Sequence, residues 1–227
     1  IVFWIIIYKK EKIKWVWASI HNIKKRFIEN FQFFISSIAG HVSVHGGLII
    51  LASFVNNTIL GEFALAQKIA LLMRMVPVFF TQAILQNATV LFKKDKIEFN
   101  SYVNRIFING LSITLGMGLM VFLLSKWIIF LLAGSFVIYS ETILKILAFI
   151  PFLSMLNFNN MIKILVDEKK YLLTRATWIT AVVMLILATI GSYYYGGYGL
   201  SIALVLTEIV SFIVYSSLLT KNKYERA

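Results

Sequence analysis

Two basic residues lie deep inside an apolar stretch of the chain, where a charged group needs an anionic partner. Lys68 and Arg74 fall within residues 61–92, a stretch long enough to cross a bilayer. On a helical wheel they share a sector of about 140° with five uncharged polar residues, Gln67, Thr81, Gln82, Gln86 and Thr89. This sector predicts either a site for an anionic substrate group or a structural ion pair with a carboxylate on a neighbouring helix.

For the substrate site, phosphate is the anion that the residue types suggest, because an arginine fork donates two parallel hydrogen bonds to it. The candidate substrate ligands on this stretch are Arg74, Lys68, Gln67 and Gln82.

The acidic residue Glu208 lies near the middle of the last apolar stretch, residues 198–219, and so near the bilayer midplane. It is a candidate counter-ion for Arg74 or Lys68. Alternatively, it binds a proton or a coupling cation, which is a recurrent use of carboxylates inside membranes. We favour the counter-ion, because one carboxylate beside two intramembrane cations is most simply their partner.

His41 and His45 form a second group of candidate substrate ligands. They are four residues apart within residues 31–55, so both rings project from one helix face. The spacing is also found among metal ligands, but two histidines alone are too few for a metal site. We therefore expect a polar pair that lines a cavity, and we predict no metal and no cofactor.

Asn157, Asn159 and Asn160 form a third polar group, near the end of residues 141–165. Hydrogen bonds to other helices are the expected use of such residues. The alternative is a patch that faces the substrate, for which Asn157 and Asn160 are the candidates.

Six apolar stretches carry all these side chains, and each is long enough for a membrane-spanning helix. The chain is 59% hydrophobic and only 14% charged, with a mean hydropathy of +0.83. The fold class predicted is therefore an all-α membrane protein, a six-transmembrane-helix bundle, with helices kinked near Pro77 and Pro151. The stretches are residues 31–55, 61–92, 100–132, 141–165, 171–195 and 198–219.

Lys and Arg occur at every second connection between the stretches. The four basic segments together hold 18 of them, and the three connections around residues 56–62, 133–141 and 195–198 hold none. Because cytoplasmic loops carry the excess of Lys and Arg, the basic segments and the C-terminus should be cytoplasmic. The net charge of +12 then reflects topology and contacts with anionic lipids, and we expect no nucleic-acid partner.

The segments outside the bundle are predicted from their composition. Residues 1–7 are apolar but too short to span, and we expect them to end a preceding transmembrane helix. Residues 8–30 alternate basic and apolar residues at helical spacing, which indicates a cytoplasmic amphipathic linker or a solvated basic loop. The transmembrane lobe then covers residues 31–220, and residues 221–227 form a cytoplasmic tail. The chain has no Gly-rich phosphate loop, nucleophile with a base or carboxylate cluster, so we expect no enzyme.

The run Ile59–Ile69, followed by Pro77, resembles the O-antigen type polysaccharide flippases of the multidrug/oligosaccharidyl-lipid/polysaccharide exporter superfamily. In that family a similar run opens the eighth helix, and a proline follows about two turns later. Residues 31–40 are similar to the opening of the family's seventh helix, and residues 197–208 to its twelfth. A second proline, frequent in the family, is absent at Leu85-Gln86-Asn87.

The resemblance implies that the chain is the C-terminal lobe of a twelve-helix MATE-like transporter in the bacterial cytoplasmic (inner) membrane. It implies alternating-access export of an isoprenoid-diphosphate-linked oligosaccharide for surface polysaccharide synthesis. The implied partners are this lipid-linked oligosaccharide and the N-terminal lobe of the same protein. The alternatives are a drug or small-molecule exporter of the same superfamily and a non-transporting membrane subunit.

Overall fold

The structure, a computed structural model, describes residues 19–224, and this part of the chain is helical without strands. Five of its segments are long and apolar enough to cross a membrane. The chain is thus an all-α protein of the multi-pass membrane type, as its composition predicts. The helices are α2 (Ile20–Ala52), α3 (Asn57–Lys94), α4 (Lys96–Ala133), α5 (Ile138–Leu147), α6 (Ile150–Leu156), α7 (Phe158–Val166) and α8 (Lys170–Tyr224).

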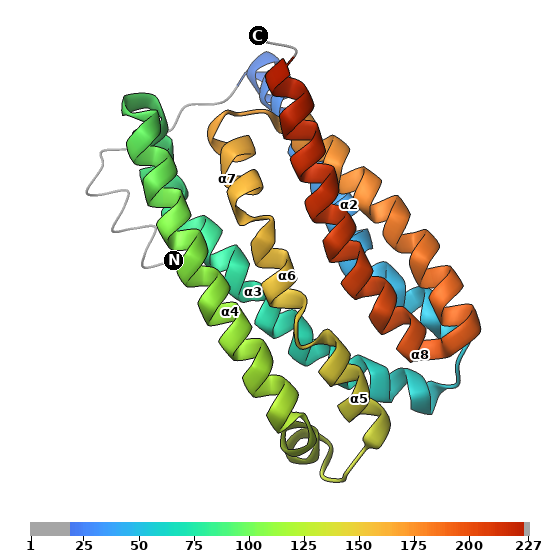
Figure 1. Ribbon diagram of the computed structural model, residues 1–227. Helices are drawn as coiled ribbons and strands as arrows, with labels where there is room; N and C mark the ends of the chain where they lie inside the picture. Colours follow the sequence, from blue (N-terminus) through green and yellow to red (C-terminus); the bar gives the residue numbers. More distant parts are fainter. Residues whose placement is uncertain (1–18, 225–227) are drawn as a thin grey trace, which may run out of the picture.

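Helix α8 folds back on itself at Gly196 (Figure 1). The backbone there has φ 56° and ψ −134°, a conformation that only glycine adopts readily. The two arms, residues 170–195 and 197–224, run antiparallel and touch at Gly191 and Gly199. A Cβ atom on either glycine would overlap the backbone of the other. The sequence predicts six separate spans; the structure has five long apolar segments, the last of which, Tyr171–Lys221, contains this turn.

The stretch between α4 and α8 is broken twice, where the sequence predicts one span kinked near Pro151. The first break falls at Ala148 and Phe149, and Pro151 lies in the first turn of α6, where an N–H would have no partner within the helix. The second break is at Asn157. In contrast, α3 continues through Pro77, and the Thr81 hydroxyl donates to the Pro77 carbonyl at 3.0 Å.

Short connections with polar caps hold α3 and α4 in place. The Asn56 side chain accepts from the Ile59 amide at 2.9 Å and so begins α3. A single residue, Asp95, separates α3 from α4, and its side chain accepts from the amides of Ile97 and Glu98. Helix α4 ends at Gly134, which has a left-handed φ of 71°.

The first and last helices run across two of the predicted boundaries. Helix α2 begins at Ile20 and runs without interruption past residue 30, where the sequence predicts the linker to end and the first span to begin. The predicted helix end at 1–7 and residues 8–18 of the predicted linker 8–30 lie outside the described residues. Helix α8 continues to Tyr224, so it includes the first residues of the predicted tail 221–227.

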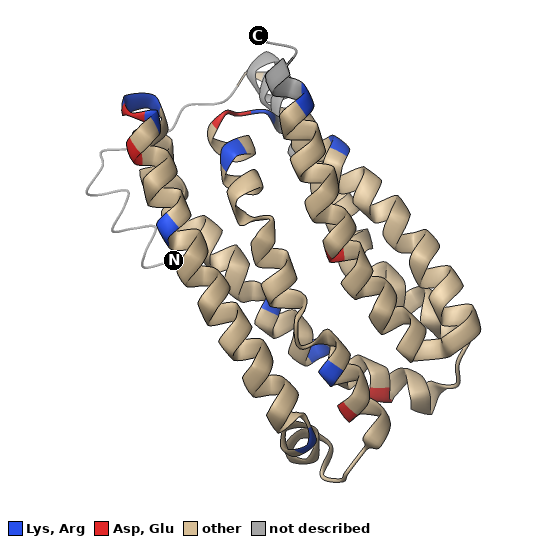
Figure 2. Ribbon diagram, in the orientation of Figure 1, with Lys and Arg blue, Asp and Glu red and all other residues tan. Residues whose placement is uncertain are grey.

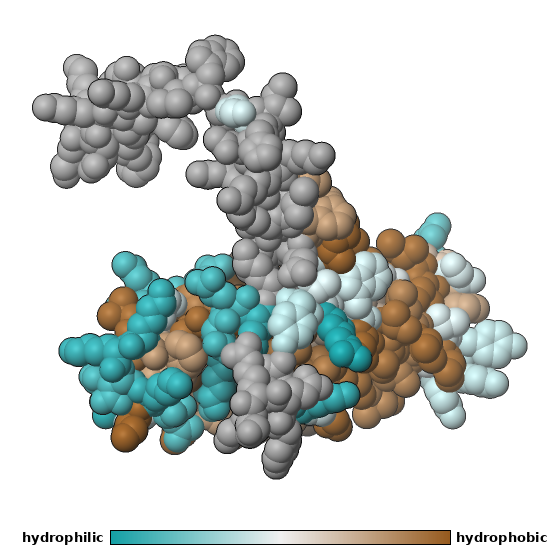
Figure 3. All heavy atoms as spheres, turned by 90° about the horizontal axis from the view of Figure 1, so that it is seen from above, coloured by the Kyte–Doolittle hydropathy of each residue, from teal (hydrophilic) through white to brown (hydrophobic). Residues whose placement is uncertain are grey.

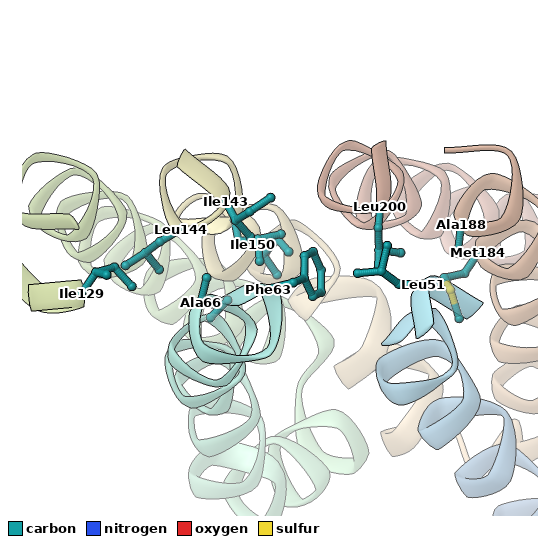
Figure 4. Packing of buried hydrophobic residues seen from close by; sticks show 12 residues of the cluster. Leu51, Phe63, Ala66, Ile129, Ile143, Leu144, Ile150, Met184, Ala188 and Leu200 are labelled. Atoms are coloured by element: carbon teal, nitrogen blue, oxygen red, sulfur yellow. The ribbon is translucent and has the colours of Figure 1, made fainter. Parts of the chain in front are cut away.

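The helices form two layers (Figure 1). Helix α2 packs along α8 in one layer, and α3, α4 and α5–α7 form the other. Buried side chains from both layers meet in one cluster (Figure 4), including Phe63 and Ile150 from one layer and Leu51 and Leu200 from the other. Since lipid is as apolar as these side chains, close packing rather than removal from water stabilises such a core.

Charged side chains gather near the helix ends, and few lie midway along the helices (Figure 2). One end of the bundle carries a basic group of residues, to which α3, α4, α7 and α8 all contribute. Seen from this end, hydrophilic residues cover much of the surface and hydrophobic residues cover the flank (Figure 3). We call this end the basic end; its exposed basic residues include Lys93, Lys94, Lys96, Lys163 and Lys221.

Candidate functional site

An ion pair joins the two layers near the middle of the long helices. Nη2 of Arg74 on α3 lies 2.6 Å from Oε1 of Glu208 on the second arm of α8. The Arg74 side chain is 32% exposed and that of Glu208 is 7% exposed. The contact is a charge-assisted hydrogen bond, which is strong where water is scarce. The structure thus pairs two of the residues that the sequence analysis selected.

A small cavity of about 40 Å³, lined by both polar and apolar residues, lies beside this ion pair. Its volume admits one or two water molecules. Helices α2, α3 and α8 and the start of α6 contribute to it, together with Leu147 at the end of α5. The polar residues that line it, apart from the ion pair, are Ser43, Gln67, Thr180, Thr207 and Ser211.

The threonine hydroxyls beside the cavity are anchored to their own helix. Thr180 donates to the Ala176 carbonyl at 2.9 Å, and Thr207 donates to the Ala203 carbonyl at 2.7 Å. Such bonds use the hydroxyl proton and leave oxygen lone pairs as acceptors. The cavity therefore offers acceptors to a bound water or cation and donors from the guanidinium of Arg74.

Further hydrogen bonds tie the layers together along the same interface. Gln67 Nε2 donates to the Val44 carbonyl of α2 at 3.3 Å. Nearer the turn of α8, the Gly197 amide donates to the Tyr139 hydroxyl at 3.0 Å. We call these contacts, the ion pair and the two asparagine contacts described next the polar seam.

The asparagines near the end of the fourth stretch reach the second arm of α8. Asn157 Nδ2 donates to Ser211 Oγ at 3.1 Å, and Asn160 Nδ2 donates to Ser216 Oγ at 2.9 Å. Asn157 is buried, and its Oδ1 has no hydrogen-bond partner. Both residues make the interhelical contacts that are their simplest expected use. Asn159 points elsewhere, into a pocket between α4 and α7.

The other selected residues do not line the cavity. The rings of His41 and His45 stack with centroids 6.1 Å apart, and both residues are exposed. Lys68 and Gln82 are also exposed on α3. The predicted polar sector of α3 is thus divided, with Gln67 and Arg74 facing the seam. Among residues 19–224, no group of three or more His, Cys, Asp or Glu side chains could hold a metal ion.

Sequence analysis missed the hydroxyl residues of the cavity, because a single Ser or Thr in an apolar span gives little signal. A spacing pattern could have found one of them, Ser211. Ser201, Glu208 and Tyr215 recur every seven residues, and Ser211 lies three residues after Glu208. All four are buried. This spacing marks one helix face that packs against other helices.

Chemically, the site can hold an anion without giving up its counter-ion. A guanidinium has five N–H donors in one plane, and Glu208 takes the edge that includes Nη2. Because part of the Arg74 side chain remains exposed, donors are left for a second anion. No protein-family model, curated protein or solved structure matches this chain.

Proposed function

We propose that the chain is the C-terminal six-helix lobe of a flippase of the O-antigen type. The flippase exports an isoprenoid-diphosphate-linked oligosaccharide across the bacterial cytoplasmic membrane by alternating access. The observation that carries the proposal is the partly exposed Arg74, held by the buried Glu208 in the middle of the apolar helices. The resemblance of the run Gly61–Pro77 to this flippase family supports it from the sequence side.

The chemistry of the substrate matches the exposed edge of Arg74. A diphosphate cannot enter hydrocarbon without a cation to offset its lost hydration. Glu208 neutralises Arg74 when the substrate is absent, so the lobe does not carry an isolated buried charge. When a diphosphate arrives, the guanidinium fork can bind it with parallel hydrogen bonds.

The proposed topology has six crossings with both ends of the lobe in the cytoplasm. The turn at Gly196 supports two crossings for α8, since each arm is long enough to span. The basic end, with Lys93, Lys94 and Lys96, then faces the cytoplasm, because Lys and Arg concentrate in cytoplasmic loops. The exposed polar residues of α2 and α3 are candidates to face the N-terminal lobe across the substrate path: His41, His45, Lys68 and Gln82.

The test is transport by the full-length protein in vesicles that contain lipid-linked oligosaccharide. Arg74→Ala should abolish flipping while the protein stays in the membrane, and Arg74→Lys should restore only part of it, because the fork is lost. Lys145→Ala is the matched control, since it removes an ion pair of equal length, 2.6 Å, between Lys145 and Glu141 within α5. Normal flipping by Arg74→Ala would overturn the proposal. Transport of apolar drugs with no flipping by the unaltered protein would favour the small-molecule exporter.

A further inference from the structure

A second polar pocket lies at the basic end, between α4 and α7. Its volume is about 300 Å³, and it shares no lining residue with the cavity beside Arg74. Ser101 of α4 lines it, and each helix also contributes a pair of polar residues four positions apart, which therefore point the same way. They are Asn100 and Asn104 from α4 and Asn159 and Lys163 from α7.

Two groups in this pocket lack partners that a ligand could supply. Oδ1 of Asn159 is buried and accepts no hydrogen bond. Lys163 is exposed, and within the described part of the chain it forms no ion pair. The Asn100 side chain already donates to the Lys96 carbonyl at 2.8 Å, which leaves the Asn104 amide as a donor. The pocket thus suits a ligand with an anionic group for Lys163 and Asn104 and a hydrogen-bond donor for Asn159.

The surface beside the pocket indicates that the ligand carries an apolar tail. Three exposed apolar residues follow Asn104 on the same face of α4, within about 60° of it on a helical wheel. They are Ile108, Leu115 and Leu119, with 54%, 39% and 47% of their surface exposed. These residues follow the pocket along α4, away from the basic end, and so place an exposed apolar strip next to it.

We propose that this pocket binds the headgroup of an anionic phospholipid that also carries a hydroxyl. The phosphate lies against Lys163 and Asn104, the hydroxyl donates to Oδ1 of Asn159, and the acyl chains follow the apolar face of α4. A bound headgroup would join α7 to α4 where the two helices are apart. This site is independent of the Arg74–Glu208 pair and of the proposed transport.

The test uses the full-length protein in detergent, with binding of dioctanoyl phosphatidylglycerol measured by native mass spectrometry. Lys163→Met should weaken binding by about tenfold or more, because a hydrogen bond to a charged group is lost. Asn159→Leu should weaken binding as well, because the acceptor for the hydroxyl is lost. Asn159→Asp should also weaken it, because a carboxylate then lies beside the phosphate. Lys94→Met is the matched control, because it removes the same charge at the same end from a residue that does not line the pocket. Unfolding temperatures without lipid identify any variant that is misfolded.

Three outcomes would overturn the proposal. Equal losses for Lys94→Met and Lys163→Met would show attraction by the general charge of the basic end. Binding of glycerol 3-phosphate as tight as that of the lipid would identify a soluble phosphate compound as the ligand. Equal binding of dioctanoyl phosphatidylcholine, which has no net charge and no hydroxyl, would remove the role assigned to the headgroup.

Discussion

Arg74 and Glu208 form an ion pair that is exposed on one side only: 32% of the Arg74 side chain is accessible against 7% of that of Glu208. The Glu208 side chain is thus enclosed, whereas about a third of the Arg74 side chain remains accessible. An enclosed charged residue such as Glu208 contributes mainly to stability, whereas a partly exposed one such as Arg74 can also bind a ligand. The two residues should therefore respond differently to substitution.

Glu208→Gln should lower the free energy of unfolding by about 3 kcal/mol, because the Arg74 charge loses its buried counter-ion. The measurement is denaturant unfolding of the purified protein, alongside transport in vesicles with and without an imposed ion gradient. Glu141→Gln is the control. Its partner Lys145 lies one turn away on the same helix, and such pairs contribute less than about 1 kcal/mol. Unchanged stability of Glu208→Gln with lost gradient dependence would instead assign Glu208 to the coupling ion.

Gly199→Ala should destabilise the protein by about 1–3 kcal/mol, because the added methyl group must displace the backbone at Gly191. The control is Gly116→Ala, in an exposed part of α4 where an added Cβ meets no atom within 4 Å. There alanine should be neutral or stabilising by up to about 1 kcal/mol. Thermal unfolding of both variants makes the comparison. A Gly199→Ala protein as stable as the Gly116→Ala protein would show that the arms of α8 do not meet at these glycines.

Single cysteines test the fold-back of α8 and the orientation together, and the sequence contains none of its own. Cysteines at Asn57 and Tyr195 should react with an impermeant maleimide added to intact cells. Those at Lys94 and Lys221 should react only after the cells are opened. Tyr195 is preferable to Gly196, because a cysteine at the left-handed φ of Gly196 would be strained. Labelling of Tyr195 and Lys221 from the same side would mean that the second arm does not cross the membrane.

The contact between Asn157 and Ser211 should be measurable by a double-mutant cycle. We expect a coupling of about 0.6 kcal/mol, and at most about 1.7 kcal/mol, which is the range of interhelical hydrogen bonds in membranes. The cycle compares unfolding of Asn157→Ala, Ser211→Ala and the double variant. A control cycle joins Asn157→Ala to Ser217→Ala, since Ser217 is exposed and bonds to its own helix. Equal coupling in both cycles would contradict a direct bond across the layers.

The apolar stretches predict the positions of the long helices well, because hydropathy reports burial in lipid directly. Stretch 100–132 corresponds to α4 at Lys96–Ala133, whose ends are set by caps at Asp95 and Gly134. A helix break within the membrane leaves the hydropathy of the stretch unchanged. The positions of the breaks at Ala148–Phe149 and at Asn157 could therefore not be predicted.

For the candidate site, the sequence likewise predicts which residues matter but not which of them are in contact. Charged residues in apolar spans stand out, so Arg74 and Glu208 could be selected from the sequence. Their pairing, and the exposure of Lys68 on the same helix, depend on how α3 is rotated against α8. The hydroxyl residues Ser43 and Thr180 face the cavity for the same reason, and a helical wheel of one helix cannot show which neighbour each face meets.

The single residue between α3 and α4 has a consequence for proteolysis. Lys93, Lys94 and Lys96 surround Asp95 and would look like an easy site for trypsin. Proteases, however, need several residues in an extended conformation, which local unfolding must first provide. Here Lys94 ends one 38-residue helix and Lys96 begins the next, so that extension would require unwinding both helix ends and losing the Asp95 cap. The most lysine-rich connection in the described part of the chain should therefore resist cleavage for as long as the bundle is folded.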